Sequence, residues 1–107
     1  MSLLSLDQLR ERLAGGQYRV TDHALGRVVE RNISAEMIRQ AGAAAQVIED
    51  YPHDKYGPSC LLLGFTAEGT PLHIQTSRRA ADRIRIITLY VPDPERWRDP
   101  RTPRQKP

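Results

Sequence analysis

The spacing of apolar residues changes from a helical period to a strand period near residue 46, and this change constrains the fold most. Before that point, apolar residues recur every three or four positions. After it come short runs rich in Leu, Ile, Val and Tyr, separated by turns that contain Gly, Pro or Asp. Helices followed by consecutive strands predict an α+β domain. We expect two to three N-terminal helices packed on one face of a four-stranded antiparallel meander sheet.

Helix-capping residues predict where the helices begin. The candidate N-cap residues are Ser5, Thr21 and Ser34, whose side-chain oxygens can accept hydrogen bonds from the free backbone N–H groups of a first turn. Gly15-Gly16 ends the first helix, the second is expected over about 22–31, and the third extends to about Ala45. Between the first two helices, 18–20 is expected to be a short extended connector or an edge strand.

The strand pattern predicts one sheet with two different faces. The expected strands are 46–52, 59–66, 71–77 and 83–91. In 71–77, apolar and polar residues alternate, so that His73, Gln75 and Ser77 share the face opposite Leu72 and Ile74. The face without helices needs a cover, and pairing with a second copy of the chain would provide it. We therefore expect a homo-oligomer.

Length and composition favour a single cytoplasmic domain. The chain has 107 residues, one cysteine and a net charge of +3, so an internal disulfide is excluded and no nucleic-acid partner is implied by charge alone. The N-terminus lacks the apolar run of a signal peptide, and no stretch approaches the length of a membrane span. We divide the chain into an N-terminal helix (1–17), an α+β domain (18–97) and a disordered, basic, proline-rich tail (98–107).

The second predicted helix carries a cationic side. On a helical wheel, Arg27 and Arg31 fall within about 80° of His23, and Glu30 lies beside them. The opposite side carries the apolar residues that we expect to be buried: Ala24, Leu25, Val28 and Val29. Two interpretations stay open, because such a side is either a solvated surface or the wall of an anion site.

A second histidine, His73, favours the anion site, although a hydrogen-bonded structural histidine is the alternative. If His23 and His73 converge, they suit acid–base cleavage of an RNA phosphodiester, one as base and one as acid. Tyr90 is a further candidate proton donor. The candidate substrate-binding arginines, which would stabilise charge on phosphorus, are Arg27, Arg31, Arg78 and Arg85.

No cofactor or metal is expected. The spacing of His23, His53 and His73 matches no metal-ligand motif, and His53 is expected to be exposed in a turn. Cys60 lies within an apolar run and is expected to be a buried small residue rather than a nucleophile.

The segments TDHALGRVVERNIS, IEDYP, CLLLGFTAEGTPLHI and RIRIITLYVP occur in this order and together resemble the bacterial domain-of-unknown-function family 4258. The resemblance covers about residues 18–97. That family is similar in layout to the RelE/ParE and BrnT toxin folds. By position, the residues that match its motifs are His23, Arg27, Arg31, His73, Thr88 and Tyr90.

The resemblance implies a metal-independent endoribonuclease of toxin type, with RNA as substrate, a small antitoxin protein as partner, and Thr88 among the substrate-binding residues. The alternatives are a non-catalytic module that binds nucleic acid or a protein, and a structural homodimer. In the binding alternative, the basic tail would supply much of the attraction to nucleic acid.

Overall fold

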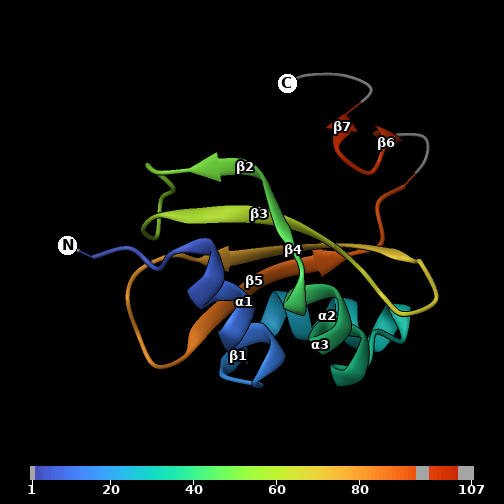
Figure 1. The fold of residues 1–107 in the computed structure, drawn as a ribbon, viewed down its shortest axis with the longest axis horizontal. Helices are drawn as coiled ribbons and strands as arrows, with labels where there is room; N and C mark the ends of the chain where they lie inside the picture. Colours follow the sequence, from blue (N-terminus) through green and yellow to red (C-terminus); the bar gives the residue numbers. More distant parts are fainter. Residues whose placement is uncertain (1, 94–96, 104–107) are drawn as a thin grey trace.

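A computed structural model describes residues 2–93 and 97–103 and has an α+β architecture. The helices are α1 (Leu6–Ala14), α2 (Asp22–Arg31) and α3 (Ala35–Ala43). The strands are β1 (Tyr18–Val20), β2 (Gln46–Tyr51), β3 (Ser59–Phe65), β4 (Pro71–Ser77), β5 (Ile84–Tyr90), β6 (Trp97–Asp99) and β7 (Thr102–Pro103). The helices gather on one side of the main sheet, and the β6–β7 hairpin lies away from them (Figure 1).

The main sheet has five strands in the order β1-β5-β4-β3-β2. β2 to β5 form the expected antiparallel meander, but β1 adds a fifth strand that runs parallel to β5. The predicted four-stranded sheet is therefore corrected to a five-stranded mixed sheet. The reason is the pairing of 18–20 with 84–86, a contact between distant segments that no local pattern encodes.

All three helices begin at the predicted caps. The side chains of Ser5, Thr21 and Ser34 each accept a hydrogen bond from a backbone N–H in the first turn. At its other end, α2 stops at Asn32, whose positive φ of 54° gives the left-handed C-terminal conformation that Asn tolerates. α3 ends at Ala43, slightly before the predicted Ala45.

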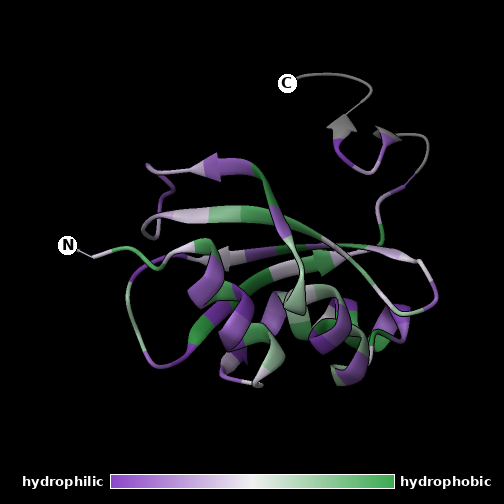
Figure 2. Cartoon of the chain, in the orientation of Figure 1, coloured by the Kyte–Doolittle hydropathy of each residue, from purple (hydrophilic) through white to green (hydrophobic). Residues whose placement is uncertain are grey.

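The two faces of the sheet follow the predicted alternation. Leu72, Ile74 and Thr76 of β4 are fully buried, and the two apolar side chains lie in the core. His73, Gln75 and Ser77 occupy the alternate positions of this strand, on the face without helices. Figure 2 shows a long apolar stretch along β3, which is buried on both faces, whereas the helices alternate between polar and apolar.

α3 approaches β3 closely because Gly64 has no side chain. A Cβ atom at Gly64 would lie 1.9 Å from the carbonyl oxygen of Ala41. Within α3, a Cβ atom at Gly42 would lie 2.4 Å from the Cβ atom of Leu13 in α1. These two glycines therefore set how tightly the first and third helices pack on each other and on the sheet.

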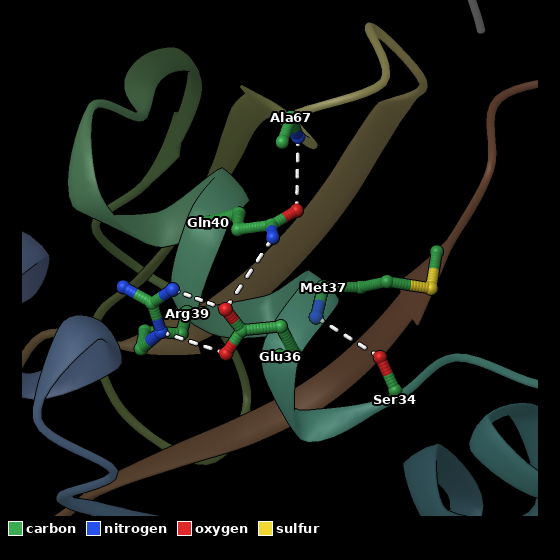
Figure 3. A network of polar contacts seen from close by, with 6 residues as sticks. All are labelled: Ser34, Glu36, Met37, Arg39, Gln40 and Ala67. Carbon is green, nitrogen blue, oxygen red and sulfur yellow. Dashed lines mark hydrogen bonds and ion pairs between the residues drawn. The ribbon is translucent and has the colours of Figure 1, made fainter.

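Polar contacts hold α3 against the turn between β3 and β4 (Figure 3). The Gln40 side-chain oxygen accepts from the Ala67 backbone N–H at 2.9 Å, and its amide nitrogen donates to Glu36. Glu36 also pairs with Arg39, and this hydrogen bond lowers the pKa of the Glu36 carboxyl. The network links one turn of the helix to the strand connection above it.

The expected buried side of α2 is narrower than the wheel predicts. Ala24 is fully buried and Val28 packs partly against the core, but Leu25 and Val29 are 51% and 72% exposed. The prediction that all four are buried is wrong for these two residues. The physical reason is that α2 packs mainly on the single strand β5, so only a narrow side of the helix is covered.

In the described part of the C-terminal tail, β6 and β7 form a hairpin. β6 and β7 pair in antiparallel fashion, and the Arg101 side chain donates to the Gln46 side chain at the start of β2. Of the tail predicted to be disordered, 104–107 lie outside the described residues. Among the helices that the structure describes, none is long and apolar enough to cross a membrane.

We predict opposite effects of alanine at two glycines. Gly64→Ala forces a methyl group against the Ala41 carbonyl, so we expect a loss of about 3 kcal/mol or more in the free energy of unfolding. Gly26→Ala is the matched control, because nothing lies within 4 Å of its Cβ position and alanine favours a helix by about 1 kcal/mol. Urea denaturation measures both, and equal stability of the two variants would contradict the close packing.

Candidate functional site

Thr21 fixes the start of α2 on β5. The pairing of β1 with β5 ends at Val20 and Ile86. The next residue, Thr21, also bonds to β5, because its N–H donates to the Ile86 carbonyl at 3.2 Å. Its hydroxyl donates to the Ile87 carbonyl at 3.0 Å and accepts from the Ala24 N–H at 3.2 Å. These bonds hold the first turn of α2 beside the middle of β5. His23 lies in this turn, two residues after Thr21, and is exposed.

His23 lines an open cavity of about 540 Å³, which we call the first cavity. Its walls come from the start of α2, the loop between β2 and β3, and the strands β4 and β5. The lining residues are Thr21, His23, Asp54, Tyr56, Gln75, Arg85 and Ile87. The cavity thus brings together an imidazole, a guanidinium, a carboxylate, an amide and a phenol.

A β-bulge shapes the wall formed by β4 and β5. The register passes from Gln75 opposite Thr88 to Thr76 opposite Ile86, so that Ile87 is the extra residue of β5. Bulges re-aim side chains next to sites in many sheets. Here Gln75 lies on the face without helices and reaches the first cavity together with Ile87.

A chain of hydrogen bonds crosses this face toward the loop. The Gln75 amide donates to the Ser59 hydroxyl at 3.2 Å, and that hydroxyl donates to a carboxylate oxygen of Asp54 at 2.8 Å. The other carboxylate oxygen of Asp54 accepts from the Lys55 N–H at 2.8 Å. The loop that carries Asp54 and Tyr56 is therefore tied to β3 and β4 rather than free of them.

His73 does not line the first cavity and is fully buried. Its Nε2 lies 2.6 Å from the Pro100 carbonyl oxygen, and its Nδ1 lies 3.2 Å from the Tyr90 hydroxyl. Because a carbonyl only accepts, Nε2 carries the hydrogen and Nδ1 accepts from Tyr90. Burial lowers the pKa of His73, and the hydrogen bond to Pro100 opposes this only in part.

The structure therefore brings together only some of the predicted site residues. His23 and Arg85 share the first cavity, whereas His73 and Tyr90 form a separate cross-strand pair whose ring centroids are 5.1 Å apart. Thr88 lies opposite Gln75 on β5 without lining the cavity.

The other predicted arginines lie elsewhere. Arg27 is half-buried and Arg31 is exposed on α2, and neither lines the first cavity. Arg78 has a structural environment, because its guanidinium contacts Asp50 at 3.4 Å and donates to the Leu4 carbonyl at 3.0 Å. These contacts join the N-terminal segment to the edge of the sheet.

Sequence reasoning missed Asp54, Tyr56 and Gln75 as lining residues. Asp54 and Tyr56 lie in the segment HDKYGP, which reads only as a turn, although an aromatic residue in a polar turn was an available signal. Gln75 was predicted on the correct face. The β-bulge at Ile87, which helps to form the cavity wall beside Gln75, has no signature in the sequence.

Cys60 and His53 lie outside the first cavity. Cys60 is buried in β3 as predicted, and burial raises the pKa of its thiol. His53 is exposed, also as predicted. Among residues 2–93 and 97–103, no cluster of three His, Cys, Asp or Glu side chains suits a metal ion.

The buried His73 predicts that the protein loses stability in acid. The unfolded chain binds a proton near the ordinary pKa of about 6.5, whereas the folded chain resists protonation because burial lowers the pKa of His73. The stabilisation that depends on neutral His73 is therefore fully present above about pH 6.5 and is lost as the pH falls below that value. Each tenfold difference in proton affinity between the folded and unfolded chains corresponds to a loss of about 1.4 kcal/mol in the free energy of unfolding.

Urea midpoints at pH 7, 6 and 5 measure this effect. His73→Gln removes the titrating group, so its midpoint is expected to fall less between pH 7 and pH 5 than that of the parent. His53→Gln, in an exposed turn, is the control and should follow the parent. The same pH dependence in His73→Gln and the parent would refute this account of His73.

Comparison with curated proteins and with solved structures gave no match to this chain. A family model, described as Domain of unknown function (DUF4258), matches residues 20–91. The match spans more than half of the 107 residues and includes α2, α3 and β2 to β5. The chain therefore belongs to the DUF4258 family, as its ordered sequence segments predict.

Proposed function

We propose that the chain is a metal-independent endoribonuclease of toxin type and that the reaction takes place in the first cavity. The observation that carries the proposal is that His23 and Arg85 line this one open cavity. An imidazole titrates near neutral pH and can move a proton, and a guanidinium can hold two phosphate oxygens at once. Cleavage of RNA through its own 2′-hydroxyl is accelerated by a group that moves a proton and by a cation that stabilises charge on the phosphate, and these two side chains can serve in those roles.

In the proposed reaction, His23 takes the proton of a 2′-hydroxyl while the 2′-oxygen bonds to the neighbouring phosphorus. The bond from phosphorus to the 5′-oxygen of the next nucleotide breaks, and that oxygen takes a proton from a water molecule. The resulting hydroxide removes the proton from His23 and restores the neutral imidazole. The products are a 2′,3′-cyclic phosphate and a 5′-hydroxyl.

Arg85 stabilises the charge that grows on the phosphoryl oxygens, where a cation has its largest effect in the transition state. Asp54 lines the same cavity as His23, and its carboxylate is held by the Ser59 hydroxyl and the Lys55 N–H. The Gln75 amide, positioned by Ser59, offers a neutral donor on the opposite wall.

This assignment changes the roles that the sequence suggested. His73 and Tyr90 are hydrogen-bonded to each other away from the first cavity, so in the described conformation they support the sheet face and transfer no proton. The antitoxin and the second copy of the chain stay predicted partners of the toxin-type protein.

A second candidate is binding of nucleic acid without cleavage. The observation that favours it is the same separation of His73 from the first cavity, which leaves one histidine where the sequence predicted an acid–base pair. In that case Arg85 and its neighbours hold phosphate but no proton is moved.

We predict that His23→Gln lowers the rate of RNA cleavage by about 100-fold or more, since it removes the proton-transferring group. Arg85→Gln is expected to lower it by a similar factor through loss of transition-state charge stabilisation. The assay follows a single-stranded RNA oligonucleotide in the presence of a chelator and detects the 2′,3′-cyclic phosphate end.

His53→Gln is the matched control and should cleave at the parental rate, because His53 is an exposed histidine outside the first cavity. Equal cleavage by His23→Gln and His53→Gln would reject the proposed site. Binding of RNA by the parent with no cyclic phosphate formed would favour the non-catalytic candidate.

A further inference from the structure

A second cavity of about 340 Å³ adjoins the first, because Tyr56 and Arg85 line both. Its walls come from β1, the loop between β2 and β3, the end of β4, the loop after it and the start of β5. Four arginines line it: Arg19, Arg79, Arg83 and Arg85. The other lining residues are Tyr56, Gly57, Pro58, Ser77, Ala80 and Ala81. No acidic side chain is among them.

The four arginines have no carboxylate partner among the described residues. The ion pairs that the structure describes join Arg10 to Asp7, Arg39 to Glu36 and Arg78 to Asp50, all outside this cavity. Arg19 and Arg85 are direct partners in the parallel pairing of β1 and β5. Paired strands are about 4.8 Å apart, so these like charges start from neighbouring backbones and repel each other. A bound anion would relieve this repulsion.

The backbone around the cavity favours access to the guanidinium groups. A Cβ atom at Gly57 would lie 3.4 Å from a guanidinium nitrogen of Arg79, so the bare glycine leaves room for that group. The φ of Gly57 is +110°, a conformation that other residues rarely adopt. On the other side, the Ser77 hydroxyl accepts from the Arg85 N–H at 2.9 Å and fixes the start of β5.

Tyr56 lies where the two cavities meet and is 74% exposed. The Lys55 ammonium lies over the ring of Tyr56, 5.3 Å from its centroid, and adds a further cation at the aromatic surface. Proteins that bind single-stranded nucleic acid combine a cationic groove with aromatic side chains on which bases stack. An exposed phenol ring between a cavity with four arginines and a cavity that shares one of them matches that arrangement.

We propose that the two cavities hold successive phosphates of a single-stranded RNA and that Tyr56 stacks on the base between them. This inference rests on the proposed function, because it places the reacting phosphate in the first cavity and a flanking phosphate in the second. A paired base has no free face for Tyr56, so the ligand is single-stranded. A mononucleotide fills only one of the two sites and therefore binds more weakly than a longer strand.

The test measures binding of a ten-nucleotide 2′-O-methyl RNA, which has no 2′-hydroxyl and is not cleaved, at several salt concentrations. Each phosphate held by cations adds about 0.7 to the slope of log affinity against log salt for a single strand. The double variant Arg79→Gln/Arg83→Gln is expected to flatten the slope by about 0.7, since it removes two of the four arginines that hold the second phosphate. Both side chains are exposed, so the fold should be retained.

Matched variants separate the site from general charge and from the ring hydroxyl. Arg31→Gln/Arg39→Gln also removes two positive charges, both outside the two cavities, and should leave the slope unchanged. Tyr56→Ala should weaken binding by about tenfold, whereas Tyr56→Phe retains the stacking ring and should bind as the parent does.

An unchanged slope in the double variant, equal affinity of Tyr56→Ala and Tyr56→Phe, or equal affinity for a duplex of the same length would overturn the inference. If poly-glutamate displaced the RNA as well as unlabelled RNA does, this would also overturn the inference, because the two cavities would then fit an acidic protein partner. Cleavage is read separately on unmodified RNA. If the slope responds as expected but no RNA is cleaved, the nuclease proposal fails and the ligand assignment stands. If RNA is cleaved but the slope does not respond, only the ligand assignment is rejected.

Discussion

The anchoring of Thr21 on β5 is the interaction on which the candidate site depends. Its backbone and hydroxyl groups bond to consecutive carbonyls of β5, and the same hydroxyl caps α2. One residue thus ends the pairing of β1, starts the helix and sets the position of His23. The extra residue of the β-bulge, Ile87, accepts from the Thr21 hydroxyl and lines the first cavity, so the cavity, the helix start and the irregularity of the sheet meet at one place.

Features encoded by neighbouring residues were predictable from the sequence. The bounds of α2 follow from Thr21 before it and Asn32 after it, and both act within a few residues of themselves. The alternation along β4 predicted that His73 and Gln75 share a face, because strand geometry alone determines it. The meander order followed from the short turns between successive strands.

Features that depend on distant pairing were not predictable. β1 has three residues, too few for a periodic pattern, and it belongs to the sheet only because Tyr18–Val20 pairs with a segment far along the chain. The face of His73 was correct, yet its environment depends on Pro100, which the sequence placed in a disordered tail. For the same reason, Arg19 and Arg83 each look like ordinary exposed arginines until the fold brings them to one cavity.

A structural explanation of the arginines must account for their number and position. A charged residue in the middle of an edge strand discourages pairing with another molecule, and Arg19 alone would serve that purpose on β1. Protection of the edge does not explain the other arginines of the second cavity. Arg79 and Arg83 come from the loop after β4 and still line this cavity. Repulsion among clustered guanidinium groups costs stability in the free protein. Binding of the anionic ligand that we propose would offset this cost, whereas protection of a sheet edge would leave it in place.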